Sequence, residues 1–289
     1  MLCYADYARY YDSPYFFGAT IGRNAGRTYP AFYRNWQGER VKLDCNEGHV
    51  HLHGGQKGMH TVLWDVRRVS DTEYELFYTD NDSPYEEMDF RLVYRLDRNK
   101  FRIDIYGKAA HPTIANVTNH SYFNLNHDKE TILHHQLQTA EASIQLIDSQ
   151  FVPTGAYDDF KTDSKEFEAF NFNAAAPIEK ALQTNTALSR ICEGGIDLAY
   201  CYHHPAEESE KIRLSNRDGS NTLIIHSDQE ACVIYTANKI TEQVEINNGK
   251  QLEKYHGITF EMQRKPNYVH EEEAILTDSY QAFTEYEII

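Results

Sequence analysis

The sequence predicts an all-β protein, built as a sandwich or a barrel, and three observations lead to this fold class. Apolar and polar residues alternate with period two in many short segments that are bounded by turn residues. Helical periodicity is scarce, and residues 178–191 are the best candidate for a helix. No Gly-rich phosphate loop follows a strand, so an α/β nucleotide-binding fold is excluded.

The clearest strands form a hairpin. Residues 90–96 and 101–107 each place their apolar side chains on one face, and the polar segment 97–100 between them predicts a tight turn. An Asp218-Gly219 turn predicts a second hairpin. The other predicted strands show the same alternation, and they are residues 72–80, 143–148, 211–215, 222–227, 232–237, 257–263 and 280–289.

Composition excludes several classes of function. The 289 residues contain 28 Lys+Arg against 44 Asp+Glu, a net charge of −16 without a basic block, which argues against nucleic acid or an anionic membrane as partner. No apolar stretch approaches the ~18–20 residues of a spanning helix, and the start lacks the features of a secretion signal. The five cysteines are odd in number and lack a C-x-x-C spacing, so we expect reduced thiols in a cytoplasmic protein.

The segment HVHLHGG (49–55) is the first candidate for chemistry. In a strand, His49, His51 and His53 would point to one side, and the two glycines would let a ligand approach the backbone closely. Such a row of imidazoles is compatible with a metal site, with acid/base catalysis or with plain surface. No Cys, Asp or Glu stands at metal-ligand spacing, which disfavours the metal.

Two further segments carry titratable side chains. In TNHSYFNLNHD (118–128), His120 stands among Asn, Ser and Tyr residues that could fix its tautomer and orientation. In FEMQRKP (260–266), Glu261 faces away from the core if Phe260 and Met262 face toward it. Residue patterns alone leave both open, because a solvated glutamate and a structural histidine are the commoner cases.

Seven motifs in order resemble the galactose mutarotase (aldose 1-epimerase) family. The rare NHSYFNL string is the most specific of them, and together they cover residues 13 to about 270. They are SPYFFGATIGRNAGR (13–27), HLHGG with Gly58 and Trp64 (51–64), NVTNHSYFNLN (116–126), FVPTG (151–155), GGIDLAY (194–200), VIYTAN (233–238) and GITFEMQ (257–263).

The resemblance implies a large antiparallel β-supersandwich and an enzyme that interconverts the α and β anomers of a free hexose without cofactor or metal. It implies His120 as general acid and Glu261 as general base. It also implies that Arg27, His53 and Asp197 bind the sugar. The implied partner is a small sugar, and we expect a monomer or homodimer in the cytoplasm.

Ring opening explains why such residues are needed. A base removes the proton of the anomeric hydroxyl while an acid protonates the ring oxygen, and each positioned transfer contributes about 10²–10⁴-fold. We therefore expect the imidazole and the carboxylate to face each other across a pocket that holds a pyranose, with pKa values near neutrality and a charged Glu261. Trp64, Tyr122 and Phe123 are candidates to cover the apolar face of the sugar.

Three features depart from the family pattern. Val233 stands where a glutamine is usual, and Gly26 stands where an asparagine usually precedes the arginine, so the preferred sugar is open. In addition, the family normally has further strands ahead of the segment at which this chain begins. We expect one domain over residues 1–289 that lacks those N-terminal strands.

Three alternatives remain beside the free-hexose enzyme. A hexose-6-phosphate 1-epimerase would need extra cations, for which Arg23, Lys57, Arg264 and Lys265 are candidates. A non-catalytic carbohydrate-binding protein on the same fold would not need both His120 and Glu261. A His-rich metal-binding protein would hold stoichiometric metal.

Overall fold

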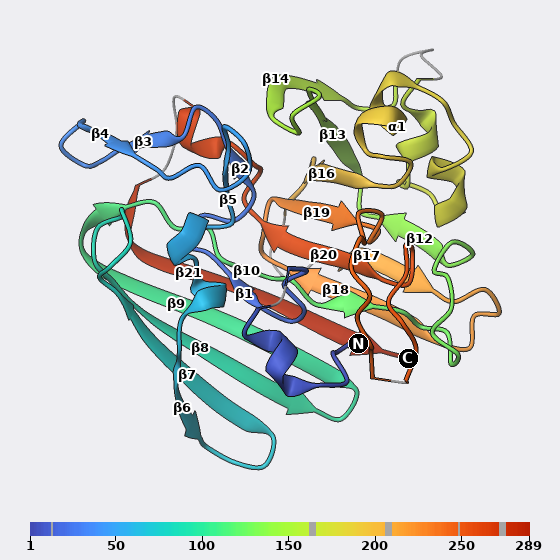
Figure 1. Ribbon diagram of the computed structural model, residues 1–289, viewed down its shortest axis with the longest axis horizontal. Coiled ribbons are helices and arrows are strands. Elements are labelled where there is room, and N and C mark those ends of the chain that lie inside the picture. Colours follow the sequence, from blue (N-terminus) through green and yellow to red (C-terminus); the bar gives the residue numbers. More distant parts are fainter. Residues whose placement is uncertain (13, 162–165, 206–209, 248, 272–275) are drawn as a thin grey trace.

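Two antiparallel sheets carry most of the structure. The computed structural model describes residues 1–12, 14–161, 166–205, 210–247, 249–271 and 276–289. Figure 1 shows the long strands of the larger sheet running side by side below the strands of the smaller sheet. Every pairing between the named strands is antiparallel, which confirms the predicted all-β class.

Among the described residues, the larger sheet has nine strands and the smaller has six. In spatial order the larger sheet is β15 (Ala176–Pro177), β12 (Gln136–Thr139), β17 (Glu210–Ser215), β18 (Thr222–Ser227), β21 (Thr277–Ile288), β9 (Lys100–Thr113), β8 (Met88–Asp97), β7 (Glu73–Asp80) and β6 (Asp65–Arg68). The smaller sheet is β11 (Tyr122–Phe123), β20 (Ile258–Gln263), β19 (Ala231–Tyr235), β16 (Asp197–Tyr202), β13 (Ala142–Ile147) and β14 (Pro153–Asp158).

Short ribbons and helical turns complete the described structure. The ribbons pair β1 (Thr20–Ile21) with β10 (Thr118–Asn119), β2 (Arg27–Thr28) with β5 (His51–Leu52), and β3 (Phe32–Arg34) with β4 (Arg40–Lys42). The 3₁₀ turns are η1 (Tyr7–Tyr10), η2 (Gly55–Lys57), η3 (Met59–Thr61), η4 (Glu168–Phe170), η5 (Ile178–Ala181) and η6 (Tyr268–His270), and the α-helix is α1 (Ala187–Ile191). In this part of the chain no helix is long and apolar enough to cross a membrane.

The main core joins the facing sides of the two sheets. Leu92 and Ile105 of the larger sheet belong to the same buried cluster as Ile234 and Phe260 of the smaller sheet. The period-two pattern therefore has its expected cause, because alternate side chains of these strands face this core. The opposite face of the smaller sheet is left to form a site.

The predicted strands agree with the structure, whereas the predicted helix is only partly present. The hairpin is formed by β8 and β9, with Arg98 in the left-handed region at its turn. Gly219, at φ 72°, turns the chain between β17 and β18. Of residues 178–191, only η5 and the five residues of α1 are helical. The polar segment between them lacks a continuous apolar stripe to bury, so a longer helix gains little from packing.

Candidate active site

A cavity of about 360 Å³ lies over the outer face of the smaller sheet. Its floor follows from the strand register, in which Glu261 of β20 is opposite Val233 of β19 and Val233 is opposite Ala199 of β16. Asp197 and Tyr235 form the neighbouring pair. These side chains share one face because residues two apart on a strand point the same way.

Glu261 lies at one end of this floor. Phe260 and Met262 are buried in the core on the other side of β20, so the predicted orientation of the three residues is confirmed. Glu261 is not solvated, however, since only 2% of its surface is exposed. Its Oε2 atom has no hydrogen-bond partner among the described residues, which leaves an acceptor for a ligand.

His120 lies beside Glu261 rather than across the cavity from it. Its Nε2 atom is 3.5 Å from Oε1 of Glu261, and both residues line the cavity. The expectation of a pyranose between the two groups is therefore wrong. An adjacent pair still suits ring opening, because the anomeric oxygen and the ring oxygen are both bonded to C1 and lie next to each other.

The residues around His120 fix its backbone rather than its ring. The His120 amide donates to the carbonyl of Ala19 at 2.9 Å, and its carbonyl accepts from Gly18 at 3.1 Å. Asn119 also donates to the Gly18 carbonyl. The Nδ1 atom of His120 has no partner from another described residue, so the predicted control of the tautomer by neighbouring polar side chains is not observed.

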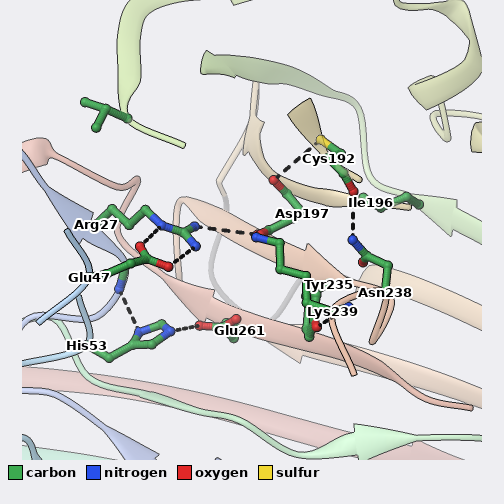
Figure 2. Close-up of polar contacts among 12 residues, drawn as sticks. Arg27, Glu47, His53, Cys192, Ile196, Asp197, Tyr235, Asn238, Lys239 and Glu261 are labelled. Atoms are coloured by element: carbon green, nitrogen blue, oxygen red, sulfur yellow. Dashed lines mark hydrogen bonds and ion pairs between the residues drawn. The ribbon is translucent and has the colours of Figure 1, made fainter. Parts of the chain in front are cut away.

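His53 reaches the same end of the cavity, but the predicted row of three histidines does not form. Strand β5 is only two residues long, and His53 has a φ of 55°, which ends the alternation. His51 points away and bonds Tyr85 at 2.7 Å, while His49 does not line the cavity. Nε2 of His53 lies 4.0 Å from Oε2 of Glu261 (Figure 2).

The glycine after His53 allows another backbone segment of the protein, rather than a ligand, to approach closely. Gly54 has a φ of 86°, and a Cβ there would lie 1.9 Å from the carbonyl oxygen of Gly22. Only glycine fits this close approach. The motif thus locks the segment that bears His53 against the segment that leads to Arg27.

An ion cluster forms the other side of the cavity (Figure 2). Arg27 donates two bonds to Glu47, at 2.6 and 3.1 Å, and its Nη1 atom is 3.8 Å from Oδ1 of Asp197. Nζ of Lys239 is 2.9 Å from Oδ2 of Asp197. All four side chains line the cavity, so the acidic groups have cations beside them.

The VIYTAN segment explains how Asp197 is held. Asn238 donates to the carbonyl of Cys192 at 2.7 Å, and Thr236 accepts from the amide of Ile196 at 2.9 Å. Both bonds fix the loop that enters β16, and Figure 2 shows the bond between Asn238 and Cys192. These two residues are therefore supports for Asp197.

Burial dominates the electrostatics of the pair. It raises the pKa of Glu261 to about 8, with Asp197 adding to the rise and Arg27 opposing it. It lowers the pKa of His120 to about 4 and that of His53 well below its ordinary value. At neutral pH these pKa values give a protonated Glu261 and a neutral His120, the reverse of the expected charges. Either arrangement holds one proton on the pair.

Three possible metal ligands lie close together at this end of the cavity. The candidate ligand atoms of His53, His120 and Glu261 lie within 4.8 Å of one another. However, Nδ1 of His53 accepts a hydrogen bond from the Gly26 amide at 3.2 Å, which places the ring proton on Nε2. The nitrogen that faces the other two groups is then not free to bind a metal, so the donor set does not fit one.

Sequence reasoning missed several residues of the site. Lys239, Glu47 and Phe151 line the cavity, as do Phe16 and Tyr235. Glu47 and Lys239 carried no motif, and only their ion pairs identify them. A charged residue directly after VIYTAN was the one available signal for Lys239.

Two sets of sequence candidates were partly or wholly wrong. Of the three aromatic candidates, Tyr122 lines the cavity, whereas Trp64 packs on Tyr78 and Phe123 on Phe260. None of the proposed phosphate-binding cations lines it. Arg23 is buried with Asp80, Lys57 pairs with Asp82, Arg264 lies over Tyr268 and Lys265 pairs with Glu271.

The five residues implied by the resemblance come together in this one cavity: Arg27, His53, His120, Asp197 and Glu261. Proton transfer is the chemistry that an adjacent imidazole and carboxyl support. The surrounding donors and acceptors are of the chemical kind that can bind hydroxyl groups. The class of protein is thus an isomerase that acts on carbohydrates.

Comparison with known proteins gives the family. Residues 1–281 match the family model for aldose 1-epimerase, and the chain belongs to the aldose 1-epimerase family. It is 27% identical to galactose mutarotase of Sus scrofa over 274 residues, covering 94% of this chain and 77% of that protein. It is 28% identical to aldose 1-epimerase of Streptococcus thermophilus over 282 residues, covering 93% and 76%. The chain is accordingly an aldose 1-epimerase, which interconverts the anomers of an aldose.

Solved structures show the same fold. A GalM/aldose epimerase homologue from C. elegans superposes with a TM-score of 0.86 at 19% identity, covering 100% of this chain and 87% of that one. Galactose 1-epimerase from Lactobacillus acidophilus gives 0.84 at 24% identity, covering 99% and 83%. The predicted β-supersandwich is therefore confirmed.

Proposed function

We propose that the substrate is a free hexose of the galactose or glucose type, with Glu261 as base and His120 as acid. The observation that carries this proposal is the 3.5 Å separation of the two groups at one end of a cavity that has hydroxyl-binding residues at the other. Glu261 takes the proton of the anomeric hydroxyl, and His120 gives one to the ring oxygen. For this the shared proton passes from Glu261 to His120 when the sugar binds.

The remaining residues bind and orient the sugar. Arg27 and Asp197 present donors and acceptors to its hydroxyl groups. His53 donates from Nε2 toward Glu261 and the sugar oxygen next to it. Proton transfer and rotation about C1–C2 complete the reaction, so it needs no cofactor.

Several further features belong to the proposal. We propose a single domain over residues 1–289, supported by the core that joins both sheets. A cytoplasmic location agrees with the five free cysteines. A monomer or homodimer that binds neither nucleic acid nor membrane agrees with the net charge of −16.

Polarimetry of freshly dissolved α-D-galactose tests the substrate. At micromolar protein we expect the optical rotation to approach equilibrium much faster than in buffer alone. The same measurement is made with α-D-glucose. Decay at the buffer rate with both sugars would reject the proposed substrate class. Glucose 6-phosphate is the contrasting compound, and it should be turned over poorly because the candidate cations lie outside the cavity.

A further inference from the structure

Lys239 places an ammonium group in the site, and the acid/base chemistry does not require this group. It follows β19, and its Nζ atom lies 2.9 Å from Oδ2 of Asp197 and 3.3 Å from the ring centroid of Phe151. An ammonium has three donors. Within the described part of the chain Asp197 is its one ion-pair partner, so donors remain for a ligand.

The two cations of the cavity differ in how far they are already engaged. Arg27 uses its Nε and Nη2 atoms on Glu47 and faces Asp197 with Nη1. Lys239 has a single flexible stem, and 26% of its side chain is exposed. Of the two, Lys239 is the group that can turn toward a substrate, and Asp197 then keeps Arg27 as a counter-ion.

The charge of the cavity wall is balanced. Arg27 and Lys239 are offset by Glu47 and Asp197, and burial raises the pKa of Glu261 to about 8, so that carboxyl is neutral at pH 7. A wall without net charge does not repel an anion, although the whole chain carries −16. The floor beside it is apolar at Val233 and Ala199, and Lys239 is the flexible cation of this wall that can pair with an anionic group.

We propose that this enzyme accepts aldoses that carry a carboxylate, the aldohexuronic acids, and that Lys239 binds the carboxylate. The inference rests on the proposed function, since it places the anomeric carbon at His120 and Glu261. A carboxylate matches Lys239, which is the less engaged of the two cations, Arg27 and Lys239. A phosphate monoester carries about −1.5 to −2 and would need a second such cation.

The alternative role of Lys239 is to hold Asp197 in place for neutral sugars. The two roles differ in a measurable way, because a lysine that only supports Asp197 affects all substrates alike. A lysine that binds the substrate carboxylate changes the preference between a uronic acid and the corresponding neutral sugar. Its effect also weakens with salt, since screening reduces attraction between charges.

The experiment compares α-D-galacturonic acid with α-D-galactose by polarimetry at pH 7, with the buffer rate subtracted. The variants are Lys239→Met, Lys239→Arg and the control Lys180→Met. Lys180 also has a carboxylate partner, Glu168, and an aromatic neighbour, Phe172, but it does not line the cavity. We expect wild type to accelerate both sugars, and KM for the uronic acid to rise more steeply with NaCl than KM for galactose.

Lys239→Met should lower the ratio of kcat/KM for galacturonic acid to kcat/KM for galactose at least tenfold, mainly through KM. Lys239→Arg should recover part of the ratio, and Lys180→Met should leave it unchanged. Acceleration of galactose alone by wild type would overturn the inference and leave the proposed function standing. Equal losses with both sugars in Lys239→Met would overturn it as well. Acceleration of neither sugar would overturn both proposals.

Discussion

Gly26 and His53 are joined by two reciprocal hydrogen bonds. The Gly26 amide donates to Nδ1 of His53 at 3.2 Å, and the His53 amide donates to the Gly26 carbonyl at 3.1 Å. The first bond makes Nδ1 an acceptor, so the neutral ring carries its proton on Nε2, toward Glu261. One backbone contact thus defines the donor that His53 directs into the cavity.

This contact predicts different outcomes for two substitutions of His53. His53→Gln keeps an N–H donor near the position of Nε2, whereas His53→Ala removes it. We expect KM for galactose to rise at least tenfold in His53→Ala and clearly less in His53→Gln, measured by polarimetry over a range of sugar concentrations. Equal KM values in the two variants would show that the donor does not contact the substrate.

The acid/base pair predicts large losses of turnover. Glu261→Gln and His120→Asn each remove one of the proposed proton-transfer groups, so we expect kcat to fall at least ~10²-fold while the circular dichroism spectrum is unchanged. Glu253→Gln is the control, because Glu253 is exposed and does not line the cavity. Near-full activity of Glu261→Gln would refute the assignment of the base.

The pH profile should have two limbs. Burial places the pKa of His120 at about 4 and that of Glu261 at about 8, so the pair holds one proton between these values. Below about 4 both groups are protonated and no base remains, and above about 8 neither is protonated and no acid remains. We therefore expect kcat/KM to fall on both sides, with pKa values that belong to the coupled pair. A profile that is flat from pH 6 to pH 10 would contradict this.

The same buried carboxyl predicts a cost in stability that grows with pH. An unfolded Glu261 loses its proton near pH 4.5, whereas the folded protein retains it up to about pH 8. Stability is thus lost as pH rises between these values, at up to about 1.4 kcal/mol per pH unit. Glu261→Gln has no such proton. The difference in free energy of unfolding, variant minus wild type, should therefore increase by about 1–3 kcal/mol from pH 5 to pH 8.

Urea denaturation of both proteins at the two pH values measures this gain. Groups that titrate in both proteins cancel in the difference. A difference that stays constant with pH would mean that Glu261 has an ordinary pKa in the folded state. A gain in stability beside the loss of turnover is the usual signature of a destabilised active-site group.

Much of the fold was predictable from sequence, because its strands have one face in the core and one outside. The alternation in β8, β9 and β20 reports which side chains face the core, and it also predicted the orientation of Glu261 relative to Phe260. Segment 178–191 was less clear because a short, polar helix leaves little periodic signal.

The site was predictable only in part, because pattern does not encode how distant segments meet. The motifs named His53, but the alternation rule placed His49 and His51 beside it, and a left-handed backbone at His53 breaks that rule. Lys239 and Glu47 entered the site through ion pairs across the fold. The reversed protonation of His120 and Glu261 arises from burial, which local sequence does not reveal.

Glu261, Val233 and Ala199 form a row across three strands. Along these strands, residues that line the cavity alternate with residues that pack in the core. Side chains that point outward line the cavity, and their immediate neighbours in sequence belong to the core between the two sheets. An exchange at Val233 or Ala199 can therefore reshape the floor beneath a ligand without opening a void in the interior. A scaffold of this kind can acquire new sugar preferences by single substitutions while the packing of its core, and hence its stability, is retained.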